Sequence, residues 1–409
     1  MIQTGESRRI AISRRGLALS AVAAAVPLLG SAVPEERTTL TYVLSTVYVA
    51  SYPDDQACPK LSLSARDIFL DTLPPAQRAE LADPAKEREL SRLLSSKYGF
   101  KGGPTGASPG RNGSAPSYTQ AELDALRAKF KIPSGKGHPT YLGLVFGYNV
   151  CTDPDDFPDF AVGNAPYLGK VTYGMNLDGK IGRHDFTGPD GEQGVDNALI
   201  AATGCNRTTR DYGDPKVADN VITSLAAPPI LQLSGVDDPQ NDDDVEVRVF
   251  VADSPLELDG SGKPLAWATF SIDPDPRFET RTRGRIKDGV LTTEPFDLRI
   301  RVREQIIDSY REIKGARIRL PLGNDDAIGG SIYGYHTLTS LFDPYIQAGT
   351  VGLNLMSCPA AVNAIRAHAD GYPDPGSRKN TAISTALNFR GVPAFAVRGD
   401  NRATPASSR

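Results

Sequence analysis

The strongest constraint on the fold is a series of short alternating segments in the second half of the chain. Apolar and polar residues alternate there as in strands that bury one side in a core. The segments are ILQLSGV at 230–236, VEVRVFVA at 245–252, AWATFSI at 266–272, RTRGRIKDGVLTT at 281–293, DLRIRVR at 297–303 and ARIRLPL at 316–322. Asp288-Gly289 is typical of a type I′ hairpin turn. Strands at such short spacing predict a mainly β, α+β fold built on an antiparallel, jelly-roll-like β-sandwich.

The other regions are expected to surround this sandwich. Residues 38–52 are rich in β-branched and aromatic side chains and predict a strand or a pair of strands. Residues 75–97 carry helix formers at helical spacing, broken at Pro84, and predict two short helices. The expected order is a signal peptide, an N-terminal strand and helical region, an Asp/Gly-rich loop region, the β-sandwich, a C-terminal helix and strand, and a disordered tail. Their ranges are 1–32, 33–138, 139–220, 221–350, 351–398 and 399–409.

The first residues carry an export signal. The paired arginines of SRRGL at 13–17 come just before an uncharged apolar run, 16–30, which is too short to anchor a helix in a bilayer. Small residues end the run, so we expect cleavage after Ala32. The arginine pair fits the twin-arginine pattern, with a general secretory signal as the alternative. Either signal predicts a periplasmic or secreted protein.

The mature chain is expected to be acidic. Removing residues 1–32 takes away four arginines and one glutamate, which leaves 41 basic and 48 acidic side chains and a net charge near −7. Nucleic acid, which binds basic surfaces, is therefore not an expected partner. No later segment approaches the roughly 18 to 20 consecutive apolar residues of a membrane-spanning helix, so no membrane insertion is expected after signal removal. The expected ligand is a small molecule, a glycan or a protein.

Four cysteines predict two disulfides in an oxidising compartment. They are Cys58, Cys151, Cys205 and Cys358, and no CxxC pair occurs among them. Three pairings are possible. We favour Cys151 with Cys205, because this pair brackets one acidic, glycine-rich segment, and Cys58 with Cys358. The alternative is free buried thiols, and a catalytic cysteine has no support because no nucleophile motif flanks any of the four.

Oxygen-bearing side chains concentrate in GMNLDGKIGRHDFTGPDGEQGVDN at 174–197. Calcium binds roughly six to eight oxygens, and glycine lets backbone carbonyls turn toward an ion, so the segment predicts a structural calcium site. The expected ligands are Asn176, Asp178, Asp185, Asp190, Asp196 and Asn197. The match to an EF-type loop is partial, because Gly174 stands where the first aspartate belongs. The alternative is a solvated loop in which these side chains serve as turn residues.

The sequence identifies no catalytic residues. The histidines, His138, His184, His336 and His368, are scattered without paired or HExxH spacing, so zinc is not expected. His184 lies beside Asp185, but a surface or capping role suits it better. The chain also lacks GxSxG, P-loop, Rossmann and CxxCH motifs. Paired carboxylates for glycoside cleavage can be distant in sequence, so a hydrolase stays open as an alternative.

Four segments of the chain resemble a family of secreted proteobacterial proteins without an assigned activity. They are CPKLSLSARDIFLDTLPPAQRAELADP at 58–84, MNLDG at 175–179, DFTGPDGEQGVDNALIAATGC at 185–205 and HADGYPDP at 368–375. The LDG…DFTxPDGxxGVDN pattern is also similar to segments of exported proteins with expected β-sandwiches, including myxobacterial ones. The resemblance implies export, a β-rich core and the importance of Asp178, Asp190, Asp196 and Asn197. It implies no reaction.

Together these features favour an exported, non-catalytic binding or accessory protein, stabilised by calcium and two disulfides. The first alternative is a secreted hydrolase that acts on a polysaccharide or another polymer, with carboxylates of residues 153–196 as acid, base or metal ligands. The second alternative is a subunit of a periplasmic redox complex, which a twin-arginine signal allows but the lack of a cofactor motif disfavours. The ligand, the ion and the oligomeric state do not follow from the sequence.

Overall fold

The computed structural model describes residues 38–63, 67, 70–71, 73–83, 163–182, 184–206, 209, 227–304, 307–323, 327–348 and 358–398. The expected signal peptide, the tail, the helix after Pro84, Cys151 and the side chain of Cys358 lie outside this part of the chain. Within it, no helix has the length and apolar character needed to cross a membrane.

The described residues form mainly strands, joined by short helices. The elements are β1 (Thr38–Val49), α2 (Pro75–Leu81), β2 (Phe186–Thr187), β3 (Gln193–Val195), α6 (Ala198–Thr203), β4 (Pro229–Val236), β5 (Asp242–Val251), β6 (Ala268–Ser271), the 3-10 helix η4 (Pro276–Phe278), β7 (Thr280–Lys287), β8 (Val290–Thr293), β9 (Phe296–Glu304), β10 (Ile307–Pro321), β11 (Ile328–Thr337), α9 (Leu338–Ala348), α11 (Cys358–His368), β12 (Gly371–Pro373) and β13 (Asn380–Val397). Asp288 and Gly289 join β7 to β8 with φ angles of 50° and 73°, as the predicted type I′ turn requires.

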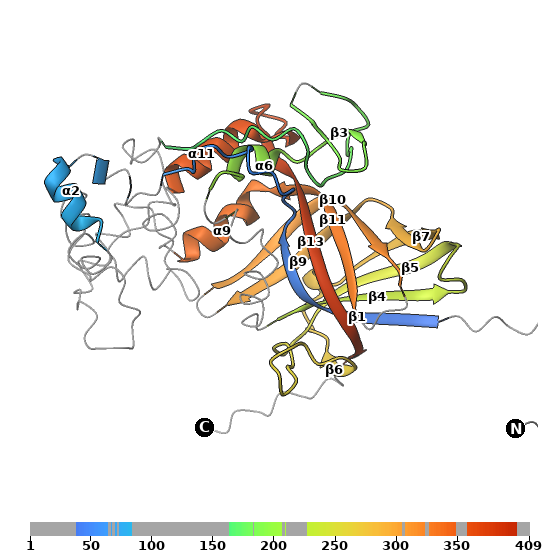
Figure 1. Ribbon diagram of the computed structural model, residues 1–409. Coiled ribbons are helices and arrows are strands. Elements are labelled where there is room, and N and C mark those ends of the chain that lie inside the picture. The colour runs from blue at the N-terminus through green and yellow to red at the C-terminus, as the bar shows by residue number, and fades with distance from the viewer. Residues whose placement is uncertain are drawn as a thin grey trace, which may run out of the picture. The chain divides into compact units, whose positions relative to one another are not determined.

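Eight antiparallel strands close into a barrel, and the expected open sandwich is wrong. Their order around the barrel is β1, β4, β5, β7, β8, β10, β11 and β13. Antiparallel pairing of β13 with β1, which lie side by side in Figure 1, completes the circle. Three strands are additional: β9 pairs with β10, β12 pairs with β13, and β6 runs parallel to β13. The fold is therefore mainly β, as expected. The eight strands form a closed barrel, because the strands at the two ends of the path, β1 and β13, pair with each other.

Closure depends on a contact between distant parts of the chain. Tyr42 in β1 lies opposite Pro393 in β13, and Val49 lies opposite Leu387. A bulge between Leu44 and Thr46 interrupts this ladder, and bulges increase the local bend and twist of a strand. Alternation of apolar and polar residues defines the buried face of each strand in a sandwich and in a barrel alike. It does not specify which strands become neighbours, which explains the wrong prediction.

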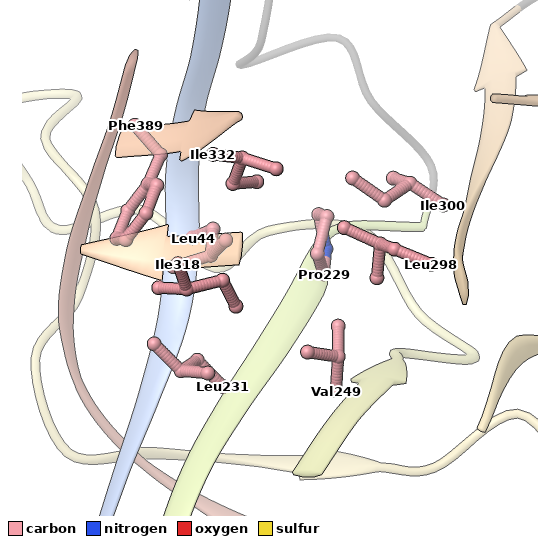
Figure 2. Close-up of a pocket in the computed structure, with 9 residues that line it drawn as sticks. All are labelled: Leu44, Pro229, Leu231, Val249, Leu298, Ile300, Ile318, Ile332 and Phe389. Atoms are coloured by element: carbon pink, nitrogen blue, oxygen red, sulfur yellow. The ribbon is translucent and has the colours of Figure 1, made fainter. Parts of the chain in front are cut away.

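The interior of the barrel is filled with apolar side chains. The buried cluster draws on β1, β4, β5 and β7 to β11 as well as β13, with Leu231, Leu298 and Phe389 among its members. Figure 2 shows nine side chains of the barrel region around a small apolar space of about 10 Å³. Such a space has room for about one water molecule. An eight-stranded barrel of this kind is a packed core, so a ligand has no room at this point of the interior.

Helices and loops cover the part of the barrel around β13. Helices α6 and α11 pack together, and both contact β13. Ile383 of β13 lies in a buried cluster with Leu199 of α6 and Ile365 of α11. Outside this cluster, Met175 and Leu177 pack against Ala386 of β13. The acidic segment of the sequence is therefore part of a layer of loops and short helices that lies against the barrel.

Candidate functional site

The MNLDG and GVDN motifs form one compact loop structure. Strands β2 and β3 pair, and Met175 forms an isolated bridge with Asp196. The Asn176 side chain donates to the Lys180 carbonyl at 2.7 Å and accepts from the Gly179 N–H at 2.7 Å. This hydrogen bonding closes the turn around Gly179, whose φ of 75° favours glycine. Of the six residues expected to bind calcium, Asp178 and Asp185 lie near enough to Asp196 to affect its pKa.

Their carboxylates serve first as acceptors for nearby backbone N–H groups. Asp178 accepts from Lys180 at 2.9 Å, Asp190 accepts from Glu192 at 3.2 Å, and Asp185 accepts from Gly182. These are the local hydrogen bonds of turn residues. Among the described residues, no three His, Cys, Asp or Glu side chains are arranged to hold a metal ion. Calcium binding stays a prediction, and this geometry supports the alternative of turn residues.

Asn197 and Asp196 fix the loop from inside. The buried Asn197 amide donates to the Tyr173 carbonyl at 2.9 Å and to the Thr172 hydroxyl at 3.3 Å. Asp196, which is 9% exposed, accepts the Leu177 N–H at 2.7 Å. Burial is the main reason that the pKa of Asp196 rises to about 6, and the carboxylates of Asp178 and Asp185 also contribute.

A second carboxylate with a raised pKa lies across from this loop. Asp370 precedes β12, and its oxygens accept the N–H of Ser384 at 2.7 Å and the Ser384 hydroxyl at 2.6 Å. Burial raises the pKa of Asp370, the two bonds from Ser384 oppose the rise, and Asp185 contributes to it. Burial, with Asp196 and Asp370 nearby, also raises the pKa of Tyr335. The negative charge beside Tyr335 therefore depends on whether Asp196 and Asp370 are protonated.

An open cleft of about 310 Å³ has Asp185 in its lining. Its lining comes from the segment 164–170, the residues 184–186, α6 and the last residue of α11, so none of it belongs to the eight barrel strands. Its lining residues are Asn164, Pro166, Tyr167, Gly169, Lys170, His184, Asp185, Phe186, Ala201 and His368. Pockets for small ligands start at about this volume. The mixture of aromatic, basic and acidic groups suits a small polar ligand.

The disulfide between Cys58 and Cys205 holds the walls of the cleft together. Both pairings that we favoured from the sequence are therefore wrong, since each assigned one of these cysteines to another partner. The Ser62 N–H donates to the Cys205 carbonyl at 2.8 Å, and the Leu168 N–H donates to the Ala57 carbonyl at 2.8 Å. The cross-link thus joins residues 57–62 to α6 and to the segment 164–170, which both line the cleft.

Tyr167 forms the apolar side of the cleft. Its ring packs edge-on against Phe186, with the ring centroids 6.0 Å apart. The hydroxyl is buried and has no hydrogen-bond partner among the described residues. Burial raises its pKa, and the negative charge of Asp54 adds to the effect. A buried donor without a partner is costly, so this hydroxyl would gain from a polar group or a water molecule in the cleft.

Sequence reasoning found only part of this site. Asp185 was expected as a calcium ligand and His184 was noted beside it, whereas Tyr167, Lys170 and His368 were not expected to contribute. HADGYPDP, one of the segments that carry the family resemblance, begins with His368, and this was the available signal. No spacing rule connects the three residues, because the disulfide and the helix packing bring them together.

A separate apolar surface surrounds Trp267, the only tryptophan of the chain. Trp267 is 58% exposed. Its φ of 64° is unusual for a bulky residue. Its N–H donates to the Pro393 carbonyl at 2.6 Å, and its ring centroid lies 5.8 Å from that of Phe395, which is 53% exposed. None of these residues lines the cleft.

No protein-family model, curated protein or solved structure matches this chain in the comparisons with known proteins.

Proposed function

We propose that this chain is an exported, non-catalytic binding or accessory protein that holds a small polar ligand in the cleft beside the barrel. One observation carries the proposal: the polar, disulfide-braced cleft measures about 310 Å³, against about 10 Å³ for the space among the apolar side chains of the barrel. Recognition therefore belongs to the layer of loops and helices, and the barrel serves as its rigid support.

The lining of the cleft also bears on the hydrolase alternative. Glycoside cleavage by acid–base catalysis uses two carboxyl groups on either side of the scissile bond. Among the described lining residues, Asp185 is the only carboxylate, and it already accepts the Gly182 N–H. Binding without turnover is therefore better supported than hydrolysis at this cleft.

The proposal can be tested by ligand-observed NMR with a library of small polar metabolites and the oxidised mature protein. Hits are expected to lose their signal with Ala201→Phe, because Ala201 lines the cleft from α6 and the larger side chain fills it. Ala367→Phe is the matched control, since Ala367 is exposed on α11 and does not line the cleft. Hits that bind Ala201→Phe as well as the control would rule out the cleft. Turnover of a hit would favour the hydrolase.

Calcium stabilisation is a separate part of the proposal. The test is titration calorimetry of the EDTA-stripped protein with calcium, together with its melting temperature with and without the ion. Tight binding that is lost on Asp178→Ala would support a structural ion in the 174–197 loop. No heat and no change in melting temperature would leave these carboxylates as turn residues.

Export is the remaining part. Replacing Arg14 and Arg15 together with lysine is expected to keep the chain in the cytoplasm, because the arginine pair is the feature that the twin-arginine pathway reads. Cell fractionation with an antibody to the mature chain measures this. Unchanged export of the double variant would indicate the general secretory route instead.

A further inference from the structure

We propose that the ligand of the cleft is a small organic anion, a carboxylate or a phosphate ester, bound next to Lys170, His184 and His368. The inference rests on the proposed binding function and adds the chemical class of the ligand. It follows from the balance of charged and hydrogen-bonding groups in the lining, where three basic side chains face a single described carboxylate.

Lys170 supplies the fixed positive charge. It is exposed, lines the cleft, and makes no ion pair or side-chain hydrogen bond with the described residues. Lys180 in the neighbouring loop is different, because its ammonium lies 3.4 Å from Asp178. An ammonium without a carboxylate partner keeps its attraction for an incoming anion. The charge of Lys170 is therefore available to a ligand, whereas the charge of Lys180 is paired with Asp178.

The two imidazoles add directional hydrogen bonds. The Nδ1 atom of His368 lies 2.8 Å from the Ala364 carbonyl, which can only accept, so Nδ1 carries the proton. This bond fixes one edge of the ring on the end of α11, and Nε2 donates to an anion when the imidazole carries a second proton there. His184 lines the cleft from the segment before β2, with no hydrogen bond to the described residues. The basic groups thus come from three separate parts of the chain.

Asp185 opposes an anion less than its charge suggests. Its carboxylate accepts the Gly182 N–H, and a backbone donor offsets part of the negative charge. The mature chain as a whole is acidic, with 41 basic and 48 acidic side chains, so long-range attraction of anions is not expected. Anion binding would therefore be a local property of the cleft, and single charge changes there should control it.

The experiment is titration calorimetry of the oxidised mature protein with succinate, inorganic phosphate and glucose 6-phosphate, with glucose and putrescine as neutral and cationic probes. At least one anion is expected to bind, and the neutral and cationic probes are not. Lys170→Gln is expected to weaken binding by about tenfold or more, the loss of one charge-assisted hydrogen bond. Lys180→Gln is the matched control with the same change in charge and should bind like the unmodified protein.

Asp185→Asn provides a test of opposite sign. The amide oxygen can still accept the Gly182 N–H while the negative charge is gone, so anion affinity should rise several-fold. The anion class is overturned if no anion binds, if Lys170→Gln weakens binding no more than Lys180→Gln, or if Asp185→Asn weakens it. Neutral or cationic ligands that Ala201→Phe excludes would then leave the binding function standing. If Ala201→Phe excludes no ligand at all, the binding function fails as well.

Discussion

Asp196 is nearly out of contact with water, yet it lies near the two carboxylates of Asp178 and Asp185. The sequence motif predicted this residue as a calcium ligand, and that role stays a prediction. Its carboxylate accepts the backbone N–H of Leu177, and the amide of Asn197 donates to the Thr172 hydroxyl and the Tyr173 carbonyl. A motif rich in Asp, Asn and Gly is compatible with both an ion site and a clamped turn, because both need oxygen acceptors at short spacing.

Replacing Asp196 by asparagine is expected to stabilise the protein at pH 7.5. The folded-state pKa of about 6 lies above the ordinary value of 3.8, so folding favours the protonated form. Ionised Asp196 therefore lowers the free energy of unfolding above pH 6, by about 3 kcal/mol, and this penalty fades as the pH falls through 6 toward 4. Asparagine can still accept the Leu177 N–H without the charge.

Urea denaturation at pH 7.5 and pH 4 measures this effect. The gain of Asp196→Asn should be present at pH 7.5 and absent at pH 4, with Asp190→Asn as an exposed control. A loss of stability at pH 7.5 that EDTA abolishes would contradict this expectation and would support a calcium ion at Asp196.

Strands β9 and β7 each carry an arginine in an ion pair, one buried and one exposed, so the two pairs can be compared directly. Arg301 of β9 lies 2.5 Å from the Asp273 carboxylate, whose side chain is 4% exposed, and 3.0 Å from Asp308 of β10. Arg283 of β7 pairs with Asp244, but both of these side chains are exposed. The sequence showed alternation in each segment, and it could not show which charges would lie opposite each other, because that depends on register.

Arg301→Ala is expected to lower the free energy of unfolding by about 3 kcal/mol, because it leaves the Asp273 carboxylate buried without its partner. Arg283→Ala, the matched control, should cost less than about 1 kcal/mol, since water screens its ion pair. Both values come from urea denaturation at neutral pH. Equal losses for the two variants would mean that the Asp273 carboxylate is better hydrated than its burial indicates.

The disulfides link the element scale to the cleft. With Cys58 bonded to Cys205, a second disulfide would have to join Cys151 to Cys358. This is one of the three pairings that the sequence allowed. Peptide mapping of the non-reduced mature protein should therefore find these two cross-linked peptides. Free thiols at Cys151 and Cys358, detected by alkylation before reduction, would contradict the second bond. The sequence could not select among the pairings, because cysteine spacing does not report distance in the folded chain.

For the molecule as a whole, the sequence predicted strands well and their closure poorly. The alternating segments all lie in strands of the structure, and the first strand was found from its β-branched residues. The long strand β13 was expected only as the strand of a C-terminal helix and strand region at 351–398, although it contacts both β11 and β1. Closure is a property of pairing between residues more than 300 positions apart, which periodicity within a segment does not encode.

Packing of the barrel also decides where a ligand can bind, which no single segment could indicate. Because the apolar side chains fill the interior, we propose the cleft formed by residues 164–170, 184–186, Ala201 and His368 as the binding site. The sequence had directed attention to the neighbouring acidic loop at 174–197. The disulfide and the packing of α6 against α11 then create the cleft from residues that are distant in the chain.

Ligand binding in the cleft can be tested by hydrogen–deuterium exchange of the oxidised mature protein, with and without the tightest-binding hit of the metabolite screen. We expect slower exchange in peptides that cover 164–170, 184–186 and the end of α11, with unchanged exchange in β4 and β5 and around Trp267. Protection confined to the barrel strands or to the Trp267 surface would contradict the account and place the ligand elsewhere.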